Sequence, residues 1–376
     1  ATSKVRNIPG FCAHLPRTML RTFDVAGQSF HVPQSYEPVR PVGHGAYGVV
    51  CCCKNTETGE EVAIKKVKIN EDTVEAKRLL REMKLLRLLD HENILSIIDI
   101  LPPVPDAKTF DSIYIVTPFM PADLSVIVKS SQALTEAHVQ TFIYQLLKGL
   151  KYMHSAGVLH RDLKPNNILV NRDCDLMICD LGLARMKPDD AMAQMTTYVV
   201  TRWYRAPELI MCSKEYNDRM DVWAAGCILA ELITRRPLFP GKDYVHQLEI
   251  TIACLGTPTD EDLAVVSGNE KASRFARSLK PDSKKSLNAL FGSSHPQALD
   301  LMKKMLQFNP KRRISAAQAL EHPYLEDHHD PADEKVCAAP LDFKDFERLE
   351  ESDIAVEELR QLIFDEATNF RALKKR

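Results

Sequence analysis

The stretch HRDLKPNNIL, residues 160–169, places an acid, a base and an amide close together: Asp162, Lys164 and Asn167. On a solvated loop, an aspartate and a lysine two residues apart have no particular meaning, because loop aspartates are usually solvated or cap a helix. The function of this stretch therefore depends on which other motifs the chain carries and in what order.

Length and composition limit the class of protein. A chain of 376 residues is too long for one ordinary core, which predicts two lobes or domains. Its 45% apolar and 27% charged residues are typical of soluble globular proteins. A formal charge of −2 gives no sign of a nucleic-acid partner. The most apolar run, VWAAGCILAELI from Val222, is too short to cross a bilayer, so we expect a buried helix and no membrane association.

The ten cysteines do not form a metal or disulfide pattern. Three are adjacent (Cys51, Cys52 and Cys53), and no CxxC pair has a downstream partner, so we expect no structural zinc. The amino-terminal residues lack the apolar core of a secretory signal. Together with unpaired thiols, this predicts a cytoplasmic and nuclear protein.

The pattern of hydrophobic residues predicts an α+β fold with a small sheet-rich lobe, a larger helical lobe and a returning tail. In the first lobe we expect a strand near Glu60–Ile69 and a helix at Val74–Leu89. An amphipathic helix is expected at Val356–Phe370. The predicted segments are an extension at 1–35, the sheet-rich lobe at 36–123, the helical lobe at 124–325 with a loop-rich insertion at about 256–297, and a tail at 326–376.

The glycine-rich stretch GHGAYGVV, Gly43–Val50, fits a loop that covers phosphates. The same spacing occurs in dinucleotide-binding folds, where a helix follows the glycines. Here the following residues predict strand, turn and strand, so we expect a hairpin. The plainer alternative is a tight hairpin turn with no ligand.

Lys65 and Glu82 form the next candidate pair. Lys65 alone would be an exposed strand lysine. Glu82, however, shares the apolar face of its helix with Leu79 and Leu86, and a carboxylate there needs a partner because burying a lone charge is costly. Lys65, on the adjacent strand, is the expected partner.

Asn167 and Asp180 flank the apolar segment ILVNRDCDLMIC, residues 168–179. If this segment folds as a hairpin, the two side chains meet and offer hard oxygen ligands that suit Mg²⁺ with nucleotide phosphates. Asp162 would then accept a proton from an attacking hydroxyl, and Lys164 would neutralise charge on the transferring group. This explains the stretch at residues 160–169.

Six motifs in order resemble those of protein kinases: GxGxxGxV, VAIK, a helix glutamate, HRDLKPxN, DxG and APE at Ala206–Glu208. The resemblance covers about Tyr36 to Leu325 and implies the two-lobed kinase fold. It implies that Asp162 is the catalytic base, that Asn167 and Asp180 bind Mg²⁺, and that Glu208 pairs with Arg313.

The same resemblance implies the residues of the nucleotide pocket. Thr117 would guard the back of the nucleotide pocket, Pro118–Met120 would form its hinge and Asp123 would lie near the ribose. The implied ATP-binding residues are Val42, Gly43, His44, Gly45, Ala46, Tyr47, Gly48, Val49, Val50, Ala63, Lys65, Thr117, Met120, Asp123 and Leu169.

The segment MTTYVVTRWYRAPE, Met195–Glu208, resembles the mitogen-activated protein kinases, which are phosphorylated on a Thr-x-Tyr motif. The matching positions are Thr196 and Tyr198, and the alternative is an ordinary polar loop. Phosphate orders a loop only where arginines receive it. The resemblance assigns that role to Arg81, Arg161 and Arg185, assigns Thr201 to positioning Asp162 and Lys164, and implies transfer to Ser or Thr before Pro.

The tail segment HHDPADE places Asp330 and Asp333 where this family has an acidic docking patch for basic peptides, although an acidic run is more often only a solvated face. The implied partners are an upstream dual-specificity MAP kinase kinase, and substrates and phosphatases with basic docking motifs. The chain is expected to be a monomer.

Three positions depart from the usual pattern. The middle residue of Thr-x-Tyr is Thr197, which leaves the subgroup open, and the second residue of the glycine loop is His44, expected to face solvent. Leu181 replaces the commoner Phe in DxG, and we expect it to fill the same apolar slot. Cys179 beside it is expected to be a buried, inert thiol.

Two other functions compete with an active kinase. One is a catalytically silent kinase-fold scaffold, which is disfavoured because the expected catalytic residues are all present. The other is a dinucleotide-binding oxidoreductase, which would need a helix after Gly48.

Overall fold

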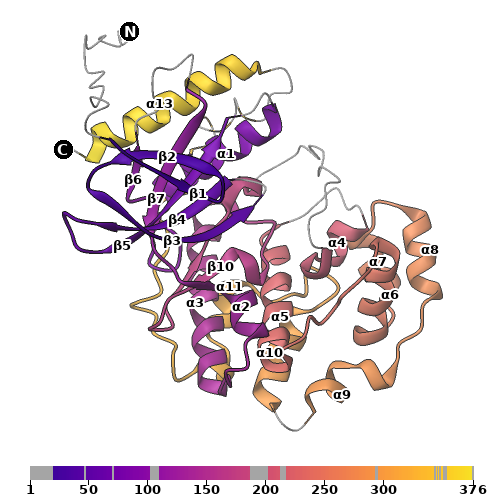
Figure 1. Ribbon diagram of the computed structural model, residues 1–376. Coiled ribbons are helices and arrows are strands. Elements are labelled where there is room, and N and C mark those ends of the chain that lie inside the picture. Colours follow the sequence, from indigo (N-terminus) through magenta and orange to yellow (C-terminus); the bar gives the residue numbers. More distant parts are fainter. Residues whose placement is uncertain are drawn as a thin grey trace. The chain divides into compact units, whose positions relative to one another are not determined.

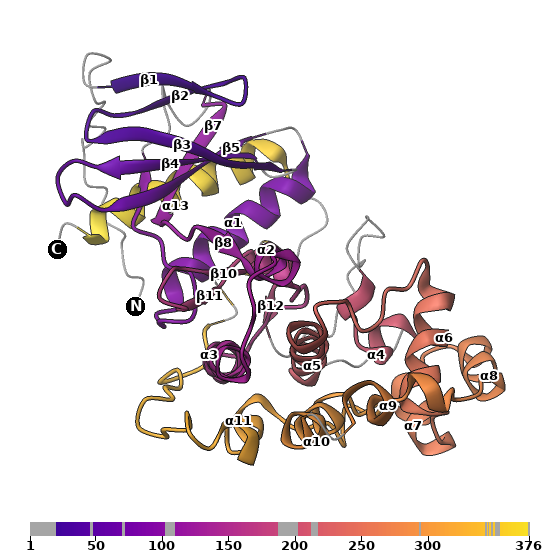
Figure 2. The ribbon, with the colours of Figure 1, turned by 60° about the horizontal axis from the view of Figure 1, so that its bottom comes forward.

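The computed structural model describes residues 20–45, 48–69, 72–101, 110–186, 202–211, 217–292, 295–342, 344, 346, 349 and 354–374. The chain divides into two compact units, which are described separately. Unit 1 consists of Ala1–Ala76, Ile97–Phe119 and Ala355–Arg376, and unit 2 of Lys77–Ser96 and Met120–Ile354. Figures 1 and 2 show the elements of each unit from two directions.

Unit 1 is built on an antiparallel sheet in the order β3-β4-β5-β7-β6. Its strands are β3 (Tyr36–Gly45), β4 (Gly48–Asn55), β5 (Glu61–Lys68), β7 (Ser112–Pro118) and β6 (Asp99–Leu101). The glycine-rich stretch lies where β3 and β4 pair, with Gly45 opposite Gly48. A strand, not a helix, follows these glycines, which confirms the predicted hairpin and excludes a dinucleotide-binding turn.

A second hairpin precedes this sheet. Strands β1 (Leu20–Val25) and β2 (Gln28–Pro33) pair antiparallel, and Gly27 takes a positive φ of 77° in the turn. Buried Phe30 and Val32 join the core of unit 1, and the Lys66 ammonium donates to the Ser29 carbonyl at 2.7 Å. Within the extension predicted at residues 1–35, residues 20–33 therefore form a hairpin that packs on the core of unit 1. Each strand is only six residues long, so the sequence alone carries a weak signal for this hairpin.

The pleat of the sheet separates two kinds of residue. Alternate side chains point to opposite faces of a strand. One face packs into the core with β1 and β2 through residues that include Val49, Cys51, Cys53, Val62, Ile64 and Val116. Val50, Ala63, Lys65 and Thr117 lie at the alternate positions and are only half-buried. These four are all predicted nucleotide ligands, so the sheet places them on the face away from that core.

Helix α13 (Val356–Lys374) lies beside β6 in unit 1, as Figure 1 shows in yellow. Arg371 binds Asp99 through two nitrogens, at 2.6 and 3.0 Å. The carboxy-terminal amphipathic helix predicted from the sequence is confirmed, although it extends four residues beyond Phe370.

Unit 2 is mainly helical, as expected, and helix α1 (Thr73–Leu88) runs into it from unit 1. Its other helices are α2 (Leu124–Lys129), α3 (Glu136–Ser155), α4 (Pro207–Ile210), α5 (Arg219–Thr234), α6 (Tyr244–Leu255), α7 (Asp260–Val266), α8 (Glu270–Ser278), α9 (Leu287–Phe291), α10 (Pro296–Met305) and α11 (Ala316–Leu320). Its short strands are β8 (Ala122–Asp123), β9 (Val158–Leu159), β10 (Ile168–Val170), β11 (Leu176–Ile178) and β12 (Arg185–Met186). The intervening 3-10 turns are Pro165–Asn167, Leu181–Leu183, Arg202–Tyr204, Ser283–Lys285 and Pro323–Leu325.

The helices of unit 2 test two of the sequence predictions. Helix α5 is buried from Met220 to Leu232, which confirms the buried helix expected there. The insertion after Gly256, expected to be rich in loops, instead contains α7, α8 and α9. Thr259, Asn269 and Ser286 cap these helices at their amino termini. None of the helices in the described part of the chain is long and apolar enough to span a membrane.

Glu208 and Arg313 form a fully buried ion pair in unit 2. The guanidinium binds both carboxylate oxygens, at 2.8 and 3.0 Å, and both side chains have no exposed surface. Arg313 also donates to the Arg219 carbonyl at 2.8 Å and stacks 5.0 Å from the Trp223 ring. The pair implied by the kinase resemblance is confirmed, and it ties α4 to the start of α5.

We expect Glu208→Gln to lower the free energy of unfolding by about 3–5 kcal/mol, because it leaves a buried guanidinium without its counter-charge. Denaturant unfolding measures this change. Glu261→Gln is a matched control, since Glu261 pairs with Arg312 at 2.6 Å on the surface and its loss should cost about 0–1 kcal/mol. Equal effects of the two substitutions would contradict a structural role for the buried pair.

Candidate active site

The three polar residues of the opening stretch converge on one carboxylate in unit 2. Asp162 is buried, and its Oδ2 atom accepts from the Lys164 ammonium at 2.6 Å and from the Asn167 amide at 3.1 Å. The same Asn167 amide donates to the Asp162 carbonyl at 2.9 Å. These contacts fix the direction of the Asp162 carboxylate, as a general base requires.

Asn167 and Asp180 flank a hairpin, as the sequence predicts. Strands β10 and β11 pair antiparallel, with Ile168 opposite Ile178. The backbone N–H of Cys179 donates to the Asn167 carbonyl at 2.9 Å, which brings the residue before Asp180 to Asn167. Asp180 has a positive φ of 63°, a conformation that costs energy for a residue other than glycine and often occurs at functional sites.

These two residues fit a magnesium ion. The Asn167 amide nitrogen is bound to Asp162, so its side-chain oxygen is the atom left to bind a cation. Asp180 supplies a carboxylate, and Mg²⁺ prefers such oxygen ligands together with substrate phosphates.

Asp221 is a positioning residue that sequence reasoning missed. Its carboxylate accepts from two consecutive backbone N–H groups, those of His160 and Arg161, both at 2.9 Å, and contacts the His154 ring at 3.0 Å. His160 is itself fully buried and links the Asp162 N–H, at 3.2 Å, to the Cys179 carbonyl, at 3.0 Å. Nothing local in the sequence marks Asp221, which resembles an ordinary first-turn helix aspartate.

The surroundings of Asp221 favour its ionised form. Burial alone would raise the pKa of Asp221, but the hydrogen bond and charge of His154 and the Arg161 N–H outweigh it and lower the pKa. Because the folded-state pKa lies below the unfolded value, this carboxylate stabilises the fold above its ordinary pKa near 3.8, and the contribution is lost as the pH falls.

Two of the predicted phosphate-binding arginines, Arg81 and Arg185, lie at or just after the turn Leu181–Leu183. Arg81 is buried and donates to the Gly182 carbonyl at 3.1 Å. Arg185 lies on β12, opposite Leu159 of β9, and Arg161 follows β9 with only His160 between them. The predicted Thr196 and Tyr198, with Thr197 and Thr201, lie outside the described residues.

The residues beside Asp180 test two smaller predictions. Leu181 has no exposed surface, which confirms that it fills an apolar slot. Cys179 is only half-buried, so the expectation of a fully buried thiol is wrong.

The predicted nucleotide residues of unit 1 follow the strand register. Val50 lies opposite both Gly43 and Lys65, and Ala63 lies opposite Thr117. Gly48 has a φ of 133°, and a Cβ atom there would lie 2.1 Å from the Lys66 carbonyl oxygen, so only glycine fits. Val42 on β3 is exposed and Val49 on β4 is buried in the core. The backbone of His44 and Gly45 belongs to β3, whereas Ala46 and Tyr47 lie outside the described residues.

The remaining predicted residues belong to unit 2. Met120 is buried, and Leu169 pairs with Asp123 between β10 and β8. Asp123 caps α2, where its carboxylate accepts from the Val126 N–H at 3.0 Å. Glu82 lies on α1 in unit 2, whereas Lys65 lies in unit 1, so their pairing stays a prediction.

Comparison with known proteins agrees with this geometry. The family model of the protein kinase domain matches residues 36–325. The chain is 49% identical to mitogen-activated protein kinase 6 of Arabidopsis thaliana over 368 residues, which cover 97% of this chain and 90% of that protein. It is 50% identical to mitogen-activated protein kinase 5 of Oryza sativa subsp. indica and 49% identical to mitogen-activated protein kinase 3 of Arabidopsis thaliana. Each of these matches covers 92% of both chains.

The fold and the site therefore define a protein serine/threonine kinase, an enzyme of a family that uses ATP and typically Mg²⁺. Within that class, the chain belongs to the mitogen-activated protein kinases and acts in signalling. An upstream kinase and protein substrates follow from this membership in general terms.

We expect Asp221→Asn to destabilise the protein by about 1.5–3 kcal/mol at neutral pH, because the amide cannot accept all three hydrogen bonds of the buried carboxylate. Hydrogen exchange of the backbone amides of His160 and Arg161 should accelerate. A general loss of stability would instead accelerate exchange throughout the fold and not only at these two amides. Asp173→Asn, on the exposed turn after β10, is the matched control. Unchanged protection of both amides in Asp221→Asn would contradict the positioning role.

Proposed function

We propose that this kinase transfers the γ-phosphoryl group of ATP to Ser or Thr followed by Pro, once Thr196 and Tyr198 carry phosphate. The observation that supports it most is the Asp162 carboxylate, which Lys164 and Asn167 hold beside the residue pair that suits Mg²⁺. The sequence of Met195–Glu208, which resembles the activation segment of MAP kinases, supports the substrate preference and the dual phosphorylation.

The chain's residues divide the chemistry among them. Asp162 orients the substrate hydroxyl and accepts its proton, and Lys164 neutralises charge on the group in transfer. Asn167 and Asp180 would hold Mg²⁺, which neutralises charge on the nucleotide phosphates. Lys65 is proposed to bind the α- and β-phosphates and Glu82 to hold Lys65 in place. Thr201 is proposed to help position Asp162 and Lys164.

Phosphorylation of the activation segment would act through charge. A phosphate adds about −1.5 to −2 charges and strong acceptor oxygens, so it can bring Arg81, Arg161 and Arg185 together. Arg81 precedes Glu82 on α1 and already contacts Gly182, two residues after Asp180. A phosphate bound there would therefore act on both the metal-binding turn and the helix that carries Glu82.

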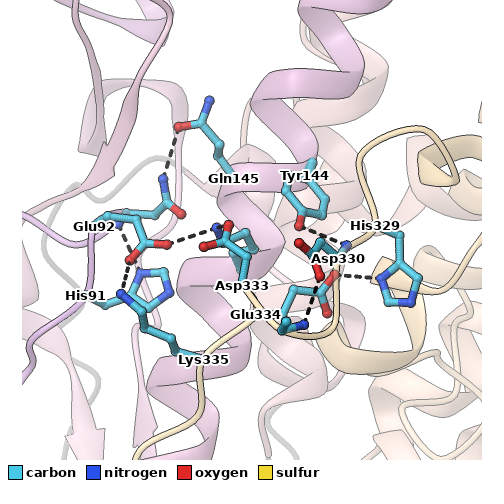
Figure 3. Close-up of polar contacts among 12 residues, drawn as sticks. His91, Glu92, Tyr144, Gln145, His329, Asp330, Asp333, Glu334 and Lys335 are labelled. Carbon is cyan, nitrogen blue, oxygen red and sulfur yellow. Dashed lines mark hydrogen bonds and ion pairs between the residues drawn. The ribbon is translucent and has the colours of Figure 1, made fainter.

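The docking surface is proposed at Asp330 and Asp333. The two carboxylates differ in their surroundings, as Figure 3 shows. Asp333 contacts the Lys148 ammonium, whereas Asp330 accepts from the Ala332 N–H at 2.9 Å and, within the described residues, takes part in no ion pair. Asp330 is thus the more available of the two for a partner's cation. The proposed partners are a dual-specificity MAP kinase kinase, substrates and phosphatases, each with a basic docking segment.

Three further properties are proposed from the sequence and from the family resemblance. We propose a monomer, which sedimentation measures, and a cytoplasmic and nuclear distribution, which a fluorescent fusion reveals. Thr197 is proposed as an additional phosphate acceptor, which mass spectrometry of the activation segment tests.

In a kinase assay with ATP, Mg²⁺ and a Ser-Pro peptide, we expect activity only after Thr196 and Tyr198 are phosphorylated. Asp162→Asn should lower kcat by about 10²–10⁴-fold with ATP affinity nearly unchanged, since it removes the proton acceptor. Asp173→Asn is the matched control, and a Ser-Ala peptide tests the need for proline. Equal activity of the phosphorylated wild type and Asp162→Asn would refute the mechanism, and no activity in either would favour a silent scaffold.

For docking, we expect Asp330→Asn to raise the Kd of an arginine-rich peptide by about three- to tenfold, because it removes one charge-assisted contact. Fluorescence anisotropy with a labelled peptide measures it. Asp260→Asn removes an equal charge on the exposed start of α7 and should have no effect. An unchanged Kd for Asp330→Asn would remove the docking proposal.

A further inference from the structure

The acidic tail segment lies against helix α3 and is already bound to the chain's own lysines. Lys148 of α3 has a side chain only 6% exposed and contacts both Asp333 and Glu92, the latter at 2.9 Å. One turn further along α3, Lys151 binds Glu334 at 3.0 Å. Figure 3 shows the acidic residues of the tail gathered over this helix.

Lys148 is held in this surface by its burial and by its ion pairs with Asp333 and Glu92. Burial alone would lower the pKa of Lys148, but its hydrogen bonds to Asp333 and Glu92 outweigh burial and raise the pKa. Removing either partner would leave a buried ammonium with less compensation, which is costly. A partner's cation therefore cannot easily replace Lys148.

Lys335 differs from Lys148 in its exposure. Its ammonium lies 3.1 Å from the second oxygen of Glu92, and its side chain is 59% exposed. The backbone N–H of Lys335 donates to the Asp333 carbonyl at 3.0 Å, which holds the residue at the end of the acidic turn. An exposed ion pair of this kind contributes only about 0–1 kcal/mol, so a competing cation can displace it.

The charges of this surface nearly cancel. Its carboxylates are those of Glu92, Asp330, Asp333 and Glu334, and its ammonium groups are those of Lys148, Lys151 and Lys335. Four negative and three positive charges leave a net of one negative charge, with His329 counted as neutral. Lys335 is the most exposed of the three lysines, so of the three it contributes most to the charge that an approaching peptide encounters.

We propose that Lys335 is a specificity-determining residue of the docking surface: its ammonium holds the Glu92 carboxylate that a partner's cation would otherwise bind. The surface then selects a compact basic segment that needs only Asp330 and disfavours a long basic run that also needs Glu92. This inference rests on the proposed docking function, and Glu92 becomes a third carboxylate of that surface.

The test measures the Kd of two labelled peptides for the full chain. The long probe carries a run of arginines, and the compact probe carries two adjacent arginines between neutral residues. Lys335→Gln should lower the Kd of the long probe by about two- to fivefold, because an exposed ion pair contributes a free energy of that size. The Kd of the compact probe should change less. Adding Glu92→Gln should abolish the gain.

A matched control separates this local effect from overall charge. Lys285 is 68% exposed and lies 3.6 Å from Asp282, and Lys285→Gln removes the same charge from the same unit. Equal tightening by Lys335→Gln and Lys285→Gln would overturn the proposal, as would a gain that survives Glu92→Gln. Activity on a short peptide without a docking segment should be the same in Lys335→Gln as in the wild type.

The experiment distinguishes a failure of the Lys335 proposal from a failure of the proposed docking function. If Asp330→Asn weakens the long probe while Lys335→Gln changes nothing, docking stands and the role of Lys335 is refuted. If neither substitution changes binding, the docking function itself is wrong at this surface, and the inference falls with it.

Discussion

The loop at residues 160–167, which carries the proposed base Asp162, depends on the buried carboxylate of Asp221. By accepting from the N–H groups of both His160 and Arg161, it restricts the backbone at two consecutive residues, and Arg161 takes a positive φ of 72°. Such a conformation persists only where surrounding contacts compensate for its cost. Asp162 follows at once, so the backbone sets where its carboxylate points before Lys164 and Asn167 bind it.

Helix α3 connects this loop with the acidic tail segment. Lys148, Lys151 and His154 are three residues apart, and such positions lie on neighbouring turns of one helical face. Lys148 and Lys151 bind the tail, whereas His154 binds Asp221. A single helix therefore supports both the proposed docking surface and the loop that carries the proposed base.

The two faces of the sheet in unit 1 differ in burial. Its strands must bury one face and leave the other available to a ligand, and the pleat achieves this through simple alternation. Ile64 enters the core, whereas its neighbours Ala63 and Lys65 remain half-buried on the opposite face. At Gly48 the backbone approaches β5 so closely that a side chain is excluded, which places the glycine-rich turn against the sheet.

The sequence by itself determined the features that depend on local order: the hairpin that joins Asn167 to Asp180, the buried helix near Val222 and the helix from Val356. Turn residues and hydrophobic period act over a few positions, so they can be read along the chain. Glu208 and Arg313 were paired only through the resemblance to kinases. The hairpin at residues 20–33, the helices after Gly256, and the roles of Asp221 and Lys335 needed the tertiary structure. Asp221 and Lys335 bind partners that are distant in the chain, His160 and Glu92, and hydrogen bonds and ion pairs between distant residues leave no periodic signal in either segment. The hairpin and the helices after Gly256 are local, but each element is short, so only a few residues carry its signal.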